Sequence, residues 1–170
     1  YEIASCLVGS EMCIRDSDGT EYCGWQIQPG LRTVEGTLKS ALNKLMGTDV
    51  PMIGASRTDA GVHAIGQVAN FHLDEHFSAE EIFEDLNRHL PEDIAVTKIK
   101  EVDERFHSRY QAVEKTYRYR IRTSPVPNVF ERKFLYQYGH PLDVDKMKKA
   151  AQALVGTHDF ASFCGNRHMK

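Results

Sequence analysis

The hydrophobic positions of the chain follow two periods, about 3.6 residues where a helix is expected and two residues where a strand is expected. Three stretches have the helical period. Each begins at a residue that caps helices well, namely Thr33, Ser78 and Asp143. Each ends at a residue that stops helices, namely Gly47, Pro91 and Gly156. Glu81, three residues after Ser78, completes a capping box and strengthens the second of these predictions.

Short alternating or apolar runs between and after these helices predict the strands. The runs are residues 20–28 (a strand and loop), 50–53, 68–73, 94–99, 115–122 and 134–138. Through residue 99 the order is therefore strand, helix, strand, strand, helix, strand. This order is typical of the split βαβ, ferredoxin-like arrangement, in which helices cover one face of an antiparallel sheet. We expect an α+β fold of this kind.

Residues 1–17 fit the pattern poorly, because their apolar positions alternate badly and Gly9 interrupts them. The stretch also looks like a translated adapter read of the kind that contaminates draft assemblies. We interpret it as an atypical segment that is not native sequence. On this interpretation the first strand of the fold is badly replaced.

A glycine-bracketed polar stretch, residues 54–71, carries the best candidate for chemistry. Three glycines, Gly54, Gly61 and Gly66, bracket it, and glycine suits tight turns and close approaches. Arg57 and Asp59 share a face if the segment is extended, so the guanidinium is expected to lower the pKa of the carboxyl. An ionised carboxylate can serve as nucleophile, base or metal ligand. The alternative is an aspartate that caps its own turn beside a solvated arginine.

A second informative stretch, residues 115–122, alternates aromatic and basic side chains. One face carries Tyr117, Tyr119 and Ile121, and the other carries three arginines. Either this is a half-buried strand with a solvated basic face, or the tyrosines stack on a nucleotide beside the basic side chains. Between residues 105 and 133 there are eight Arg and Lys against two Glu, which favours phosphate contacts although the net charge is −3.

Composition excludes several classes of protein. No apolar run is long enough to span a membrane, and no secretory leader is visible. The four cysteines, Cys6, Cys13, Cys23 and Cys164, follow neither a C-x-x-C spacing nor a disulfide framework, so we expect a reduced, cytoplasmic protein. Three histidines lack the paired spacing of metal ligands, and we expect no metal; they are His63, His72 and His76.

The string Arg-Thr-Asp-Ala-Gly-Val-His-Ala at residues 57–64 resembles the signature of the tRNA pseudouridine synthase A family. Similar stretches extend the resemblance over roughly residues 18 to 164. They are Asp18-Gly19-Thr20, Tyr22, Gly24-Trp25-Gln26, Thr33-Val34-Glu35-Gly36, Leu90-Pro91-Glu92-Asp93-Ile94, Phe106-His107-Ser108-Arg109 and Tyr117-Arg118-Tyr119.

The resemblance implies roles for four residues. Asp59 would be the catalytic group that isomerises uridine to pseudouridine, a reaction without cofactor or metal. Arg57 would fill the space left by the flipped nucleotide and hold it, and Tyr117 would stack on the uracil. His63 would contact RNA, or it would fix the loop through a backbone bond. The implied substrate is the anticodon stem-loop of tRNA at positions 38 to 40, and the implied assembly is a cytoplasmic homodimer.

The resemblance also divides the chain. Residues 18–104 are expected to form an N-terminal catalytic lobe, and residues 105–170 a connecting basic strand and the start of a second, similar lobe. In the family a strand-rich half follows, with a basic residue that pairs with the aspartate, so we expect little or no turnover from residues 1–170 alone. Two alternatives stay open. One is a non-catalytic RNA-binding module, and the other is a hydrolase with Asp74 or Glu75 as a second carboxylate.

Overall fold

The computed structural model describes residues 9–73 and 77–163. The chain divides into two compact units, residues 1–117 and residues 118–170, and each is described by itself. The lobe boundaries expected from the sequence stay predictions. Cys6, Asp74, Glu75, His76 and Cys164 lie outside the described residues.

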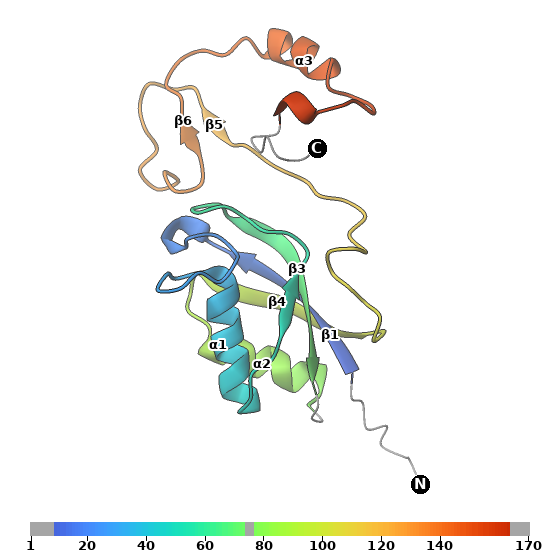
Figure 1. The fold of residues 1–170 in the computed structure, drawn as a ribbon. Coiled ribbons are helices and arrows are strands. Elements are labelled where there is room, and N and C mark those ends of the chain that lie inside the picture. Colours follow the sequence, from blue (N-terminus) through green and yellow to red (C-terminus); the bar gives the residue numbers. More distant parts are fainter. Residues whose placement is uncertain (1–8, 74–76, 164–170) are drawn as a thin grey trace. The chain divides into compact units, whose positions relative to one another are not determined.

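A four-stranded antiparallel sheet forms the first unit (Figure 1). Its strands are β1 (Gly9–Ser17), β2 (Met52–Gly54), β3 (Ala64–Leu73) and β4 (Ile94–Val102). They lie in the order β2-β3-β1-β4, so that each βαβ crossover leaves a gap that another strand fills. The predicted split βαβ, ferredoxin-like α+β arrangement is confirmed.

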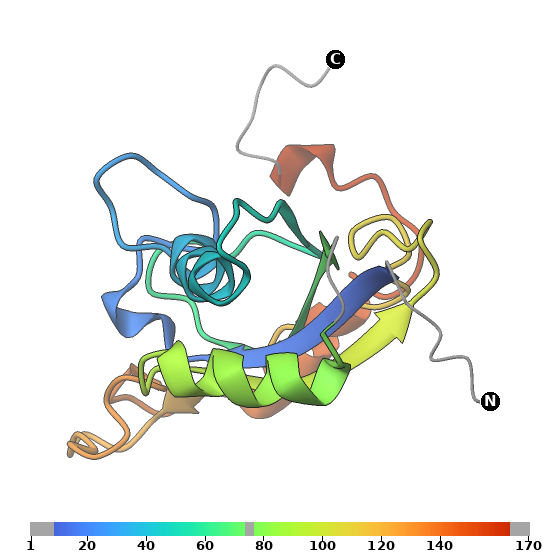
Figure 2. The same ribbon diagram turned by 90° about the horizontal axis from the view of Figure 1, so that it is seen from below.

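Two helices cover one face of this sheet. They are α1 (Val34–Met46) and α2 (Ala79–His89), and Figure 2 looks down the axis of α1 and shows α2 lengthwise. Both begin as predicted. The hydroxyl of Thr33 accepts from the amide of Gly36, and Ser78 with Glu81 forms the capping box. The core between helices and sheet includes Leu38, Leu42, Phe71, Ile82, Leu86 and Val96.

Strand β1 is the first correction to the sequence analysis. We expected a badly replaced first strand, yet Gly9–Ser17 pairs with β3 on one side and with β4 on the other. Backbone groups supply these hydrogen bonds, so poor alternation of the side chains does not by itself prevent a central strand from pairing on both edges. Whether residues 1–17 are native sequence stays a prediction.

Two ionisable side chains of β1 are buried. Glu11 and Arg15 point into the helix-covered core, with 3% and 1% of their surfaces exposed. The Glu11 Oε2 and Arg15 Nε atoms have no hydrogen-bond partner among the described residues. Burial, helped by the nearby Glu101, raises the pKa of Glu11 to about 7, and burial lowers the pKa of Arg15 to about 10. The guanidinium of Arg15 stacks 4.1 Å from the ring of Trp25.

The stretch 20–28 is a second correction, because it forms no strand. A short 3₁₀ turn, Gly19–Glu21, is followed by irregular backbone. Its amide groups bond elsewhere, since Cys23 donates to the carbonyl of Arg32 and Trp25 donates to that of Thr58. Trp25 itself is buried in the core.

The second unit contains little regular structure. Strands β5 (Ile121–Arg122) and β6 (Tyr136–Gln137) pair in parallel, and α3 (Val144–Gln152) begins at the predicted cap, Asp143. The longer strands expected at 115–122 and 134–138 are therefore wrong except at these four residues. Alternation alone does not make a strand, because a strand needs a hydrogen-bonded neighbour, and residues 113–119 have none in the described range.

The helix α3, all of which the structure describes, contains no buried residue. Its apolar side chains, among them Val144 and Met147, stay about half exposed. Within the described ranges, no helix combines the length and the apolar character that crossing a membrane requires.

Glu11→Gln tests the buried carboxyl. The folded-state pKa of Glu11 is about 7 against an ordinary value of 4.5, so the folded chain binds more protons between these pH values. Stability should therefore fall as pH rises through this window, and the neutral amide should remove that fall. We expect the variant to resist urea better than the parent chain at pH 8 and about equally at pH 4.5. Identical pH dependence of the two urea midpoints would contradict this account.

Candidate active site

The predicted polar loop joins β2 to β3 and spans residues 55–63. Its first part is fastened to β3, since the amide of Ala55 donates to the carbonyl of Val68 at 2.8 Å. The side-chain amide of Gln67 donates to the carbonyl of Ser56 at 2.7 Å and to its hydroxyl at 3.0 Å. The loop therefore leaves the sheet in a defined direction.

The loop rests on the backbone of residues 19–25 on both sides of Asp59. Before Asp59, the amide of Trp25 donates to the carbonyl of Thr58 at 3.0 Å. After it, the amide of Gly61 donates to the carbonyl of Tyr22 at 3.1 Å. A turn closes between them, with the amide of Val62 donating to the main-chain carbonyl of Asp59 at 3.2 Å.

Two glycines permit this close approach of backbone to backbone. A Cβ atom on Gly24 would lie 2.6 Å from the carbonyl oxygen of Thr58, and a Cβ on Gly19 would overlap the carbonyl of Val62. Inside the loop Gly61 has a φ of 76° and forms the turn. The sequence analysis predicted special backbone at Gly61 but missed the role of Gly19 and Gly24.

The carboxylate of Asp59 is exposed at the tip of the loop. It makes no hydrogen bond or ion pair with any residue in the described ranges, so it does not cap its own turn. The predicted pairing with Arg57 is wrong, because the Arg57 Nη1 donates to the Oε1 of Gln26 at 3.0 Å instead.

His63 closes the loop against the Asp18-Gly19 turn. Its Nδ1 lies 3.1 Å from the amide nitrogen of Gly19 and 3.1 Å from the Oδ1 of Asp18. One nitrogen cannot accept from the amide and donate to the carboxylate together, so the tautomer selects one contact. Either contact fastens the end of the loop, which favours the structural alternative for His63.

A pocket of about 630 Å³ lies beside the root of the loop, within the first unit. Ser56, Gln67 and Val68 line one side, and Arg109 and Lys115 belong to the other. The volume falls within the range of about 300–1,000 Å³ that is usual for small-ligand sites. The pocket therefore has room for a nucleoside.

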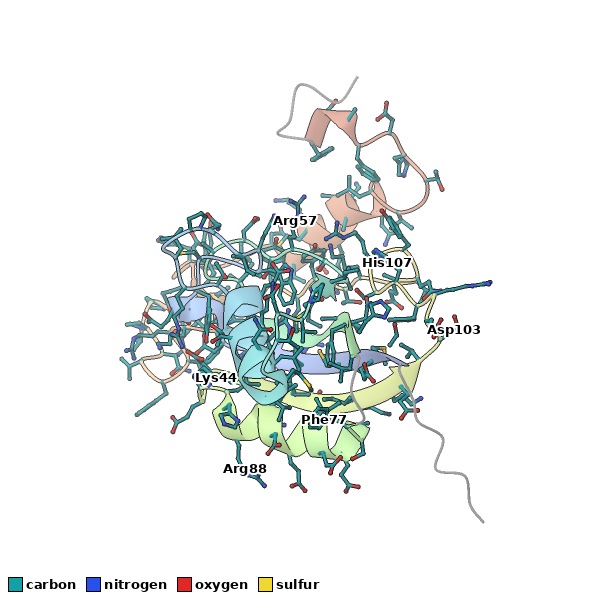
Figure 3. All side chains as sticks on the ribbon, turned by 60° about the horizontal axis from the view of Figure 1, so that its bottom comes forward. Lys44, Arg57, Phe77, Arg88, Asp103 and His107 are labelled. Atoms are coloured by element: carbon teal, nitrogen blue, oxygen red, sulfur yellow. The ribbon has the colours of Figure 1, made fainter. Side chains whose placement is uncertain are left out.

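The segment 106–115, which forms the far wall of the pocket, is bonded to the sheet. Ser108 donates through its amide to the Oδ1 of Asn70 at 3.0 Å and through its hydroxyl to the carbonyl of Ile53 at 2.8 Å. Asn70 alternates with the core residue Phe71 along β3, so this segment crosses the face opposite the helices. Figure 3 labels His107, which belongs to this segment, and Arg57, which belongs to the loop. The sequence analysis missed the role of Asn70.

Among the described residues, Tyr117 makes no hydrogen bond or ring contact with the loop. Its ring is 65% exposed, and the ammonium of Lys115 lies 5.5 Å from the ring centroid. The structure thus groups Arg57, Asp59 and His63 on one loop and leaves Tyr117 on the exposed stretch beyond the pocket. In residues 9–73 and 77–163, no three His, Cys, Asp or Glu side chains form a set that could hold a metal ion.

A family profile described as tRNA pseudouridine synthase matches residues 14–111. This range contains the loop, its backbone support and most of the pocket. The chain belongs to the tRNA pseudouridine synthase family. The match begins at Ile14, so the first half of β1 lies outside it.

Relatives named tRNA pseudouridine synthase A agree with this assignment. The protein of Limosilactobacillus reuteri (strain DSM 20016) is 50% identical over 149 residues, which are 86% of this chain and 58% of the relative. That of Bacillus sp. (strain KSM-64) is 45% identical over 154 residues, 90% of this chain and 63% of the relative. That of Acetivibrio thermocellus is 46% identical over 150 residues, which are 88% of this chain and 62% of the relative. The chain thus spans about three fifths of their length.

Gly24→Ala tests the backbone support, with Gly30→Ala as its control. Both glycines have positive φ, 84° and 72°, so both variants carry the strain of about 1–2 kcal/mol for a left-handed residue. Only the Cβ at position 24 meets another backbone, because nothing lies within 4 Å of that at position 30. We expect Gly24→Ala to lose a further 1–3 kcal/mol, roughly, in urea unfolding. Equal losses would contradict the close approach.

Proposed function

We propose that this chain carries the catalytic lobe of an enzyme that isomerises uridine to pseudouridine in tRNA, with Asp59 as the catalytic group. One observation supports the proposal above all others. The carboxylate of Asp59 is exposed and unpartnered among the described residues, yet backbone hydrogen bonds hold the loop on both sides of it. A fixed loop with an unengaged acid at its tip suits a group that acts on a substrate.

The reaction requires little besides such an acid. The bond between C1′ of the ribose and N1 of uracil breaks, the base turns, and C5 bonds to C1′ while the C5 proton is lost and N1 takes up a proton. Atoms and electrons balance without an oxidant, a reductant or an energy donor. Asp59 would act as a nucleophile at C1′ or C6, or as a base at C2′. The pocket beside the loop would retain the detached uracil.

The substrate base must leave its stack before Asp59 can reach it, at a cost of a few kcal/mol. Arg57 is exposed next to Asp59 and is tethered by one hydrogen bond to Gln26, so it can exchange that partner for a phosphate or a vacated base position. Tyr117, exposed beyond Lys115, would stack on the uracil. His63 would hold the loop and contact RNA only secondarily.

The finer assignments follow from the family resemblance. The substrate is the anticodon stem-loop of tRNA at positions 38 to 40, and the working assembly is a cytoplasmic homodimer that needs neither metal nor cofactor. Family membership favours this isomerase over the two alternatives, the silent RNA-binding module and the Asp59-dependent hydrolase. The second carboxylates considered for the hydrolase, Asp74 and Glu75, lie outside the described residues.

Asp59→Asn tests the catalytic role. Tritium release from tRNA with C5-labelled uridine reports the isomerisation, and we expect the amide to abolish it while RNA affinity changes little, because the amide occupies the same space. The assay uses this chain joined to the C-terminal remainder of the Limosilactobacillus reuteri relative, and in parallel this chain alone, which we expect to turn over little. Glu80→Gln, an exposed carboxylate on α2, is the control. Parallel loss of affinity and turnover would make Asp59 structural.

Arg57→Ala tests the RNA contact. Removing one cation from a phosphate contact should weaken tRNA binding modestly and reduce the slope of log K against log salt by about 0.7–0.9. Arg88→Ala is the control, because Arg88 is also exposed but belongs to α2, where it pairs with Glu84 and Asp85. Figure 3 labels both arginines. A salt slope equal to that of the parent chain in filter binding would remove Arg57 from the RNA interface.

A further inference from the structure

A polar cluster of three side chains, Tyr22, Arg32 and Asp93, adjoins the backbone that supports the loop of Asp59. The hydroxyl of Tyr22 donates to the Oδ1 of Asp93 at 2.5 Å. The Nη2 of Arg32 donates to the Oδ2 of Asp93 at 2.9 Å and to the hydroxyl of Tyr22 at 2.9 Å. The guanidinium also stacks on the ring of Tyr22, 4.3 Å from its centroid. Each member therefore contacts both others.

The cluster has the properties of a rigid unit. Tyr22 is 3% exposed, and the side chains of Asp93 and Arg32 are 25% and 45% exposed. Burial, together with the hydrogen bond to the neighbouring Asp93 carboxylate, raises the pKa of Tyr22 to about 12, so its hydroxyl stays a donor throughout the physiological range. Hydrogen bonds to charged groups are stronger than neutral ones, and here both oxygens of the carboxylate are used.

Main-chain bonds join the cluster to the loop. The carbonyl of Tyr22 accepts from the amide of Gly61, two residues after Asp59. The carbonyl of Arg32 accepts from Cys23, and that of Asp93 accepts from Asp18. The side chain of Tyr22 is thus held by Arg32 and Asp93, and its main-chain carbonyl holds the loop at Gly61.

We propose that Tyr22, Arg32 and Asp93 are positioning residues, which hold the backbone of Tyr22 in place so that Gly61 and the turn after Asp59 stay fixed. The inference rests on the proposed function for its consequence in catalysis. The cluster contains one full positive and one full negative charge, which offset each other. It therefore acts on Asp59 through geometry.

The first test measures hydrogen exchange in the 170-residue chain. Tyr22→Phe keeps the ring and its stacking on Arg32 but removes the hydroxyl. We expect the amides of Gly61 and Val62, which are hydrogen-bonded in the parent chain, to exchange about tenfold faster, which corresponds to the loss of one hydrogen bond to a charged group. The amides of β3 should exchange as in the parent chain. Lys39→Gln is the control, because it breaks an exposed ion pair of 2.9 Å with Asp49 that does not touch the loop.

Variants at Asp93 separate positioning from general stability. Asp93→Ala removes both acceptors and should loosen the loop as much as Tyr22→Phe or more, whereas Asp93→Asn keeps one acceptor for Tyr22 and should restore part of the protection. Faster exchange in β3 and in the loop to the same degree, with no recovery in Asp93→Asn, would overturn the inference. That result would leave the cluster as an ordinary stabilising contact.

The second test measures tritium release in the joined protein described for Asp59. Tyr22→Phe should lower kcat about tenfold and leave KM nearly unchanged, because a displaced acid affects the reaction more than RNA binding. Unchanged kcat with a loosened loop would overturn the positioning role. Should no variant and no parent protein release tritium, the proposed function fails, while the exchange experiment still decides whether the cluster holds the loop.

Discussion

The contact between two stretches of backbone, residues 19–25 and residues 58–62, is the constraint on which the rest of the site depends. Side chains play little part in it, since carbonyl and amide groups bond directly and glycines occupy the positions where a Cβ would intrude. A contact of this kind leaves the side chains of the loop available. Asp59 and Arg57 can therefore face a substrate while main-chain hydrogen bonds at Thr58 and Gly61 hold the loop.

In strand β1 of the sheet the backbone is well paired, whereas the inward side chains pack poorly. The backbone of β1 bonds to strands on both sides and completes the split βαβ order, although half of the strand lies outside the family match. Its inward side chains fit less well, because Glu11 and Arg15 place ionisable groups in an apolar core. Topology is thus preserved at a cost in stability, and the loop keeps its support because Trp25 still packs against Gly54.

Much of the fold could be predicted from local signals. The caps at Thr33 and Ser78 and the helix end at Gly47 depend on nearest neighbours in the sequence, and the structure confirms them. The third helix ends at Gln152, before the Gly156 at which we expected it to end. The failures share a different cause. Residues 115–119 of the strand expected at 115–122 have no strand partner in the described range, and Arg57 bonds to Gln26, 31 residues away, instead of to Asp59. Contacts between residues that are distant in the sequence decide both outcomes, and the spacing of hydrophobic positions does not predict such contacts.

The motion of the loop in the free protein tests this account most directly. Backbone ¹⁵N relaxation of the 170-residue chain would report order parameters for residues 55–63 and for β3 in the same sample. We predict loop values of about 0.85, equal to those of the strand, because the loop is held before any RNA binds. Values below about 0.6 around Asp59 would contradict the claim, since they would mean that the substrate and not the protein orders the acid.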